Sequence, residues 1–406
     1  MSERGINRRE FMGKTTLGLF STSLGIPLLK SNDVNQEKKQ KIIYRTLGRT
    51  KLQIPIVSFG VMNSDSPDLL RKALDLGIKH FDTAHLYLRG NSEKVIGEVL
   101  QQTGKRKEVY VATKMRFARD REKNVFLLEG NAREPGATEE NFNKQLNLSL
   151  KRLRSDYVDI LHIHSCYSPQ MVTFEPLMKA LVKAKEAGKA RFVGISTHQN
   201  IPEVIKSVVD AEIYDVIEVV YNFMQKNRDE VKKAISYAAS KDIGIVAMKT
   251  QGGRRSSEDS KNEFNHKAAL KWVLNDENVC TTIPGMTTFE QMDLNFSVMS
   301  NLSLSEQEKR DLQMSYMMKG ALYCQNCRSC IATCPHNVEI PNLMRAYMYA
   351  EGYGNLIQAG MTIEELPNNR GLEVCANCSS CSASCRYGIN VKTRVAALIE
   401  NGFYYA

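Results

Sequence analysis

The sequence predicts an α/β protein in which a closed (β/α)8 barrel, the TIM-barrel fold, precedes a smaller, mostly α-helical domain. Eight short apolar runs alternate with eight helical patterns over about 250 residues, which is the order of elements in such a barrel. The competing fold, an open doubly wound sheet, normally has a G-x-G-x-x-G sequence after its first strand, and this chain has none there. We therefore divide the chain into a leader and linker at residues 1–41, the barrel at 42–315 and the C-terminal domain at 316–406.

The predicted strands are short apolar runs, and the segments between them carry apolar residues at helical spacing. Strands are expected at Ile54–Gly60, His80–Thr83, Val109–Lys114, Tyr157–His164, Arg191–Ser196, Val216–Tyr221, Ile243–Lys249 and Val279–Pro284. Helices are expected at Ser66–Asp75, Asn91–Gln102, Glu139–Leu153, Glu175–Ala187, Ile201–Val209, Asp229–Ser240, Phe264–Asn275 and Thr288–Met299. Before the barrel, Ile42–Arg45 and Lys51–Ile54 flank a turn that contains glycine, which predicts a β-hairpin.

One connection of the predicted barrel is unusually long. Residues 116–137 follow the third strand and are rich in arginine. Long loops in this position of a barrel often form lids or substrate walls, and a solvated loop without a specific role is the alternative. After the barrel, the capping box Ser305-x-x-Glu308 predicts the start of a helix that leads toward the C-terminal domain.

The N-terminal segment holds much of the positive charge. The formal net charge is +10, and the first 45 residues contribute nine Lys/Arg and four Asp/Glu, 9 − 4 = +5. Because no platform of aromatic and basic residues follows elsewhere, we expect no nucleic-acid partner. Arg8-Arg9, then Phe11 and a weakly apolar stretch, resemble a twin-arginine signal, which exports folded proteins.

We therefore expect a periplasmic or otherwise exported protein, in contact with the membrane only transiently unless the leader stays uncleaved. No clear A-x-A cleavage site follows the apolar stretch. The alternatives are an ordinary amphipathic tail and a cytoplasmic protein.

Eight of the ten cysteines form two runs with the same spacing, C-x2-C-x2-C-x3-C. They are Cys324, Cys327, Cys330 and Cys334, then Cys375, Cys378, Cys381 and Cys385. Three thiolates two residues apart can bind one face of a cubane cluster, and the fourth usually reaches the other cluster of a pair. The spacing predicts two [4Fe–4S] clusters and disfavours two zinc sites or disulfides. The gap of 40 residues between the runs (375 − 334 − 1) resembles that of mostly helical two-cluster ferredoxin domains.

Four polar residues stand at or just past the carboxyl ends of predicted strands, where barrel enzymes hold their catalytic groups. They are Asp82, Tyr87, Lys114 and His164. A lysine held by an aspartate favours the phenolate of a nearby tyrosine and lowers its pKa, so that the phenol can transfer a proton. A histidine can orient the carbonyl oxygen that receives this proton. Taken singly, each residue also fits a structural role, as a cap or as part of the core.

The segment from about residue 43 to 315 resembles the aldo/keto reductase family. The resemblance begins at Tyr44-Arg45-Thr46-Leu47-Gly48-Arg49-Thr50 and extends through Ile283-Pro284-Gly285 to Asn295. It implies a barrel that binds extended NAD(P)H at its carboxyl face and reduces carbonyls without a metal or flavin. It also implies the tetrad above, with Tyr87 as general acid. The cysteine domain is similar to the C-terminal extension of one branch of that family.

The same resemblance implies a set of cofactor contacts. Ser196 would hold the nicotinamide carboxamide together with Glu218, which replaces the usual glutamine and, if ionised, cannot donate a hydrogen bond. Tyr221 would stack on the ring, and Lys249 could reach the pyrophosphate. Gly285, Thr287, Gln291 and Asn295 would hold the adenosine end. Gly285 and Gln291 lack the cation that often binds a 2′-phosphate, so NAD and NADP both stay open.

The sequence thus predicts an oxidoreductase that interconverts a small carbonyl compound and an alcohol. One alternative is an iron–sulfur electron-transfer protein, with a redox partner protein, that uses the barrel as a nucleotide- or sugar-binding scaffold. Hydride carries two electrons and each cluster accepts one, and no flavin motif is present to divide them. Clusters that only stabilise the C-terminal domain are equally compatible with the sequence.

Overall fold

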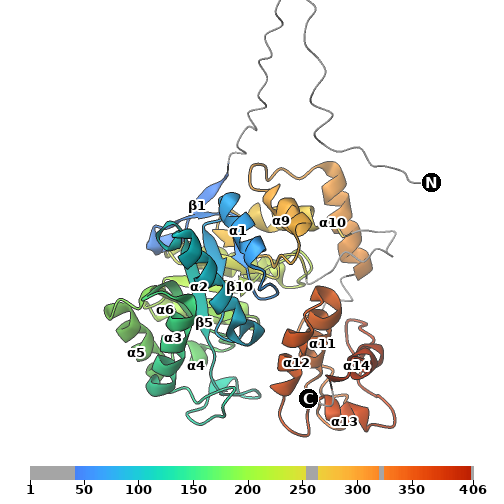
Figure 1. The fold of residues 1–406 in the computed structure, drawn as a ribbon. Coiled ribbons are helices and arrows are strands. Elements are labelled where there is room, and N and C mark those ends of the chain that lie inside the picture. The colour runs from blue at the N-terminus through green and yellow to red at the C-terminus, as the bar shows by residue number, and fades with distance from the viewer. Residues whose placement is uncertain (1–41, 253–263, 320–323, 404–406) are drawn as a thin grey trace, which may run out of the picture. The chain divides into compact units, whose positions relative to one another are not determined.

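The computed structural model describes residues 42–252, 264–319 and 324–403, and these belong to one compact unit. The predicted leader and linker, residues 1–41, lie outside the described residues. Among the helices of the described ranges, we find none whose length and apolar character would let it cross a bilayer. Helices α11–α14 form a group beside the barrel (Figure 1).

Eight parallel strands form the central sheet, in the order β12-β11-β10-β9-β8-β5-β4-β3. They are β3 (Phe59–Gly60), β4 (His80–Asp82), β5 (Tyr110–Met115), β8 (Val158–Ile163), β9 (Ala190–Thr197), β10 (Val216–Val220), β11 (Gly244–Met248) and β12 (Thr281–Thr282). The first and last strands meet through parallel bridges, Val57 with Thr282 and Gly60 with Gly285, so that the sheet curls onto itself. The α/β barrel predicted from the sequence is confirmed.

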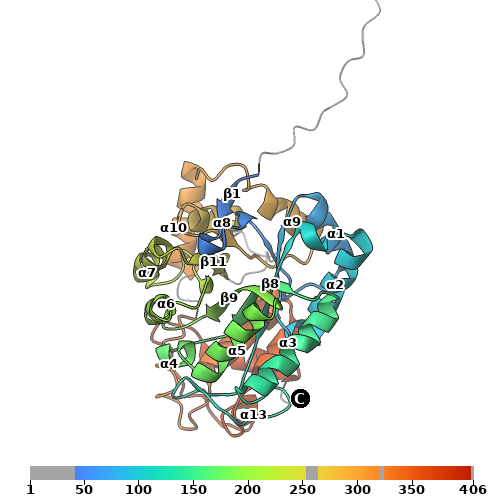
Figure 2. The ribbon, with the colours of Figure 1, turned by 90° about the vertical axis from the view of Figure 1, so that its left-hand side faces the viewer.

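Helices cover the outside of this sheet, so that the strands lie inside a ring of helices (Figure 2). The helices are α1 (Pro67–Asp75), α2 (Asn91–Thr103), α3 (Glu139–Leu153), α4 (Pro169–Val172), α5 (Glu175–Glu186), α6 (Ile201–Asp210), α7 (Arg228–Ser240), α8 (His266–Leu274) and α9 (Phe289–Phe296). Local chemistry sets their starts. At α1, for example, the Ser66 side chain accepts from the Leu69 amide and Pro67 occupies the first turn. Apolar residues of strands and helices form one continuous core.

The first barrel strand is shorter than the sequence predicts. Ile54 and Pro55 belong instead to the antiparallel hairpin of β1 (Tyr44–Thr46) and β2 (Gln53–Pro55), where Tyr44 pairs with Pro55. The 3-10 turn Gly48–Thr50 connects the two strands, and a Cβ at Gly48 would lie 2.4 Å from the Asp242 carbonyl oxygen. The hairpin therefore packs against the start of β11, and only Phe59 and Gly60 remain for the barrel.

The long loop 116–137 contains a second antiparallel pair that the sequence pattern did not predict, β6 (Arg119–Asp120) with β7 (Val125–Phe126). It is partly buried, because Phe126 packs edge-on against Phe117 and Phe174. The loop is therefore ordered and packs against the barrel.

The C-terminal part is helical, as expected. It contains α10 (Glu306–Lys319), α11 (Ile340–Tyr347) with a π-helical turn at Met348–Gly352, α12 (Leu356–Glu364), α13 (Leu372–Ala376) and α14 (Val391–Glu400). The predicted capping box is present at α10, where the Ser305 and Glu308 side chains each bind the other residue's amide. Residues from Cys330 onward form a separate apolar core centred on Leu343, Leu372 and Leu398. The domain boundary predicted near residue 315 stays a prediction.

Candidate active site

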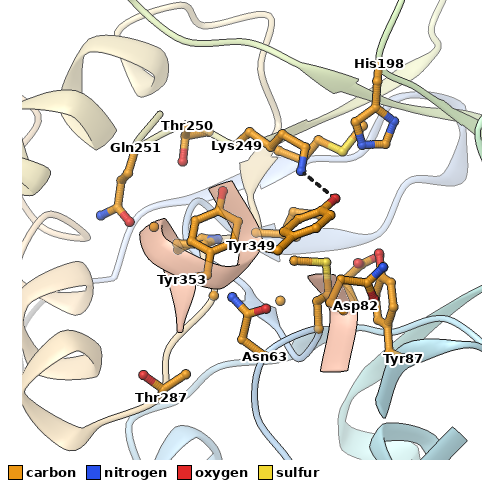
Figure 3. Close-up of a pocket in the computed structure, with 18 of the residues that line it drawn as sticks. Asn63, Asp82, Tyr87, His198, Lys249, Thr250, Gln251, Thr287, Tyr349 and Tyr353 are labelled. Atoms are coloured by element: carbon orange, nitrogen blue, oxygen red, sulfur yellow. Dashed lines mark hydrogen bonds between the residues drawn. The ribbon is translucent and has the colours of Figure 1, made fainter. Parts of the chain in front are cut away.

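A cavity of about 370 Å³ lies at the carboxyl ends of the barrel strands (Figure 3). One side of it is lined by residues that end or follow strands, including Asp82, His164 and Lys249. The other side comes from α11, the π-helical turn and α12, which contribute Arg345, Tyr349 and Glu365 among others. The cavity therefore lies between the barrel and the C-terminal helices.

Tyr87 reaches the cavity from a short and unusual turn after β4. Its amide binds the Ala84 carbonyl, and the next three residues, Leu88, Arg89 and Gly90, all have positive φ angles of 50°, 56° and 86°. The φ of 86° at Gly90 favours glycine, and a Cβ there would also displace the Arg152 guanidinium, whose carbon would lie 2.3 Å away. This backbone reverses before α2 begins and leaves the tyrosine ring facing the strand ends.

The four residues of the predicted tetrad are brought together. Lys114, fully buried at the end of β5, donates to the Asp82 carboxylate and, at 3.0 Å, to the Thr83 carbonyl. Its Nζ lies 5.3 Å from the centre of the Tyr87 ring. The Tyr87 and His164 rings meet edge to face, with centroids 5.9 Å apart. A phenol, an ammonium group and an imidazole thus converge on one point of the cavity.

Glu218 adds a second carboxylate to this group. Its Oε2 lies 3.2 Å from Lys114 Nζ, a charge contact that is not a well-directed hydrogen bond, so that this oxygen is buried without a hydrogen-bond partner among the described residues. Burial and the Asp82 charge raise the pKa of Glu218 to about 8, although Lys114 opposes this. One lysine therefore faces two carboxylates, and Glu218 retains its proton at neutral pH.

Burial sets the direction of the pKa shift for Tyr87 and His164, whereas two carboxylates set it for Lys114. The pKa of Tyr87 is raised above its ordinary value by burial, and Lys114 only partly counteracts this rise, contrary to the net lowering that we expected. The pKa of Lys114 is raised because Asp82 and Glu218 outweigh its burial. Burial and the charge of Lys114 hold the pKa of His164 well below its usual range. At neutral pH the site holds a neutral phenol, a cationic lysine and a neutral imidazole.

The residues expected at the cofactor divide into two groups. Six of the eight line the cavity: Glu218, Lys249, Gly285, Thr287, Gln291 and Asn295. Ser196 is buried behind it, where its Oγ accepts from the Ser165 amide at 3.0 Å. Tyr221 packs on Trp272 with ring centroids 5.2 Å apart, and its hydroxyl points to Asp276. This placement does not support stacking of Tyr221 on a nicotinamide, and the proposed contacts stay predictions.

The wall from the C-terminal domain was missed by the sequence analysis. The Tyr349 hydroxyl lies 3.3 Å from Lys249 Nζ, and in Figure 3 its ring stands between Lys249 and Asp82. Tyr353 also lines the cavity. The only signal in the sequence is that Tyr349 and Tyr353 are four residues apart, and aromatic residues at helical spacing usually belong to a core.

The eight cysteines lie around the C-terminal core as two sets. Burial raises the pKa of Cys324, and the neighbouring Cys385 and Cys327 add to this rise. Burial also raises the pKa of Cys330, to which Cys324, Cys385 and Cys327 contribute. Burial raises the pKa of Cys375 to about 12, with contributions from Cys334, Cys381 and Cys378. Each set thus contains three thiols of one run and the fourth of the other. Within the described ranges, no three His, Cys, Asp or Glu side chains are close enough to hold a metal ion as they stand.

Comparison with known proteins shows which family the barrel matches. The family model of the aldo/keto reductase family matches residues 58–268, which is 211 of the 406 residues. L-galactose dehydrogenase from Arabidopsis thaliana is 28% identical over 302 residues, covering 64% of this chain and 89% of that protein. L-glyceraldehyde 3-phosphate reductase from Escherichia coli O157:H7 is 24% identical over 333 residues, covering 68% and 92%.

Among solved structures, an aldo-keto reductase from Bacillus halodurans in its holo form aligns with a TM-score of 0.54 at 21% identity. The alignment covers 68% of this chain and 96% of that one. At this identity the likeness supports the fold.

Proposed function

The chain belongs to the aldo/keto reductase family and is an oxidoreductase, and we propose that it interconverts a carbonyl compound and an alcohol with NAD(P)H as hydride donor. The observation that carries this proposal is the convergence of Tyr87, Lys114, Asp82 and His164 at one end of the cavity. A dehydrogenase and a reductase among its relatives support the same class of reaction.

The lining of the cavity supports an extended nicotinamide cofactor as its occupant. It runs without interruption from Tyr87 to Gly285 and Gln291, which would place the reactive ring and the adenosine at opposite ends. Near the ring, the unpartnered Glu218 oxygen is available to the carboxamide. Because a protonated carboxyl group both donates and accepts, Glu218 can replace the amide side chain usual at this position.

In this proposal the bound nicotinamide supplies the hydride, and the protein residues control the proton. Tyr87 holds a proton on its hydroxyl and passes it to the substrate oxygen. Lys114, fixed by Asp82 and Thr83, stabilises the phenolate that remains after this transfer. The neutral His164 imidazole orients the substrate oxygen with a ring N–H. The wall of C-terminal helices excludes water from these groups.

The proposal is tested by Tyr87→Phe, assayed with small aldehydes and with NADH and NADPH separately. Loss of the proton donor is expected to lower kcat about 10²–10⁴-fold. Tyr110→Phe serves as the matched control, because Tyr110 begins β5 at the opposite end of the barrel. If Tyr87→Phe retained most of the turnover, the catalytic assignment would be wrong.

We further propose that the C-terminal domain binds two [4Fe–4S] clusters. The spacing of the two runs supports this proposal, as does the electrostatic effect that three thiols of one run and the fourth of the other have on each other. Protein purified without oxygen is expected to contain two clusters of four irons with matching acid-labile sulfide. Cys327→Ala or Cys378→Ala should remove the iron of one cluster. Zinc without sulfide would contradict the proposal.

Whether these clusters carry electrons is a separate question. Reversible reduction in an anaerobic redox titration, altered by added nicotinamide, would support electron exchange with the barrel site or with a partner protein. Clusters that stay oxidised at every accessible potential would support a structural role.

We also propose export by the twin-arginine route, on the basis of Arg8-Arg9 and the need to insert clusters before export. Replacing both residues with lysine should retain the protein in the cytoplasm, as measured by cell fractionation. Unchanged distribution would rule this route out. Nicotinamide in the periplasmic protein would indicate that the cofactor travels bound.

A further inference from the structure

One side of the cavity carries more positive charge than its own carboxylates neutralise. Arg116, from the loop after β5, and Arg345, from α11, line the cavity. Arg119 and Arg121 belong to the same loop as Arg116 but are not among the lining residues. Two carboxylates face them. Glu365 binds Arg116 through both of its oxygens, and Glu134 pairs with Arg116 and Arg121. Four guanidinium groups thus share two carboxylates.

Arg345 is the guanidinium left over at the cavity wall. Its guanidinium donates a hydrogen bond to Asn342 Oδ1 at 2.6 Å, one turn earlier on the same helix. Among the residues that the structure describes, no Asp or Glu side chain lies within 4.0 Å of it. Tyr167, Tyr349 and Glu365 raise its pKa from a distance, against its burial, but no carboxylate pairs with it directly. A half-buried guanidinium without a paired carboxylate is costly. This cost is offset when an anion occupies the cavity.

Tyr167 lies beside the same arginines. It is buried in the cavity wall with the Arg119 guanidinium over its ring, 4.4 Å from the centroid. Burial alone would raise its pKa, but the charges of Arg119 and Arg345 outweigh burial and lower the pKa to about 7. A phenol that ionises so easily indicates a strongly positive local potential.

We propose that this side of the cavity binds an anionic group of the substrate, a carboxylate or a phosphate, with Arg345 as its anchor. The proposal rests on the proposed carbonyl reductase function and names the substrate class. A guanidinium fork matches both anions through two parallel hydrogen bonds. Arg345 also lies near His198, whose pKa it lowers, and Arg116 acts on His164 in the same way. The anion site therefore belongs to the same cavity as His164, the histidine that would orient the carbonyl.

The cofactor phosphates are expected elsewhere. Thr287 and Gln291 line the cavity in or before α9, whereas Arg345 neighbours Tyr167 and His198. Lys249 contacts Tyr349 and also acts on His198, so the separation rests on Thr287 and Gln291. Arg345 also lies outside residues 58–268, the part shared with the family. The C-terminal domain thus supplies the residue that selects the substrate.

The test compares Arg345→Gln with the parent on two matched pairs of aldehydes. The pairs are succinic semialdehyde with butanal, and glyceraldehyde 3-phosphate with glyceraldehyde. We expect the parent to favour the anionic member of at least one pair, and Arg345→Gln to lower that preference in kcat/KM about 10–100-fold, the range for a hydrogen bond to a charged group. Arg345→Lys should restore part of it. Which pair responds separates a carboxylate from a phosphate.

Arg133→Gln is the matched control. Arg133 also pairs with a residue of the C-terminal domain, Glu364, but its side chain is 65% exposed and does not line the cavity. It should leave the preference unchanged. An equal loss for charged and neutral aldehydes in Arg345→Gln, or no preference in the parent, would overturn the proposal.

A second readout does not depend on turnover. Succinate or inorganic phosphate bound beside Arg345 should raise the pKa of Tyr167, which is measured as loss of tyrosinate absorbance near neutral pH and is absent in Tyr167→Phe. If no aldehyde is reduced but this shift occurs in the parent and not in Arg345→Gln, the reductase function fails and the anion site stands. If neither anion shifts the titration, the anion site fails.

Discussion

Glu218→Gln should stabilise the protein, and increasingly so as the pH rises. Glu218 is 2% exposed and shares Lys114 with Asp82, so that its ionised form is disfavoured in the folded protein. Glutamine has nearly the same shape and cannot ionise. It also keeps a donor and an acceptor for a carboxamide.

The size of the effect follows from the pKa of Glu218, which is about 8 in the folded protein against an ordinary value of 4.5. Because the folded state keeps its proton while the unfolded state loses it, this group lowers the free energy of unfolding as the pH rises from 4.5 to 8. At about 1.4 kcal/mol per pH unit, the cost is ~3 kcal/mol at pH 7 and below ~1 kcal/mol at pH 5. The cost is constant above the folded pKa.

The measurement is the midpoint of thermal unfolding for parent and variant at pH 5, 7 and 9, at one scan rate and under anaerobic conditions. The gain from Glu218→Gln should be small at pH 5 and several degrees at pH 7 and 9. Glu98→Gln removes an exposed carboxylate paired with Arg154 and should change the midpoint little at any pH. A Glu218→Gln difference that did not vary with pH would mean that Glu218 is ionised throughout, and the reasoning would be refuted.

Three further predictions concern the structure around the site. Gly60→Ala places a Cβ 2.5 Å from the Ile283 carbonyl oxygen at the barrel seam and should lower the free energy of unfolding by about 3 kcal/mol or more. Gly285→Ala is the control, because its Cβ meets only the movable Asn63 side chain at 3.1 Å, and it should lower the free energy of unfolding only slightly. Arg116→Met removes the two-oxygen partner of Glu365 and one of the two arginines that pair with Glu134, and should cost about 3 kcal/mol in denaturant unfolding. Arg133→Met, its exposed counterpart, should cost below about 1 kcal/mol. Iron chelation should increase hydrogen exchange in residues 324–403, whereas the amides of β8 and β9 should stay protected. An equal increase in the two regions would contradict separate apolar cores for the barrel and the C-terminal helices.

Local patterns were sufficient for most of the barrel. Strand ends fixed by apolar runs placed Asp82, Lys114 and His164 at one face, because parallel strands of a barrel present their carboxyl ends together. The tetrad was therefore predictable before any packing was known. Tyr87 was also predictable, although the three positive φ angles after it were not.

Features that depend on long-range packing were not predictable. Ile54 and Pro55 carry a good strand pattern, but only tertiary structure decides that they pair with β1 and not with the barrel. Tyr221 occupies a strand end, yet its ring turns toward Trp272. The net lowering expected for the Tyr87 pKa considered the lysine charge and omitted burial, which is larger here. Arg345 and Tyr349 reach the cavity across an interface between two parts of the chain that no local pattern describes.

The exposed residues of the cavity wall have a consequence for the order of events in a turnover. The described lining residues that are exposed all lie in or before α9: Gly285, Thr287, Glu290 and Leu294. Tyr87 and Tyr167, at the other side of the cavity, are buried. Whatever occupies the α9 half stands in the path of anything leaving the inner half. A product that leaves on this side would depart no faster than the molecule in front of it exchanges, so its release, more than bond making, would limit kcat.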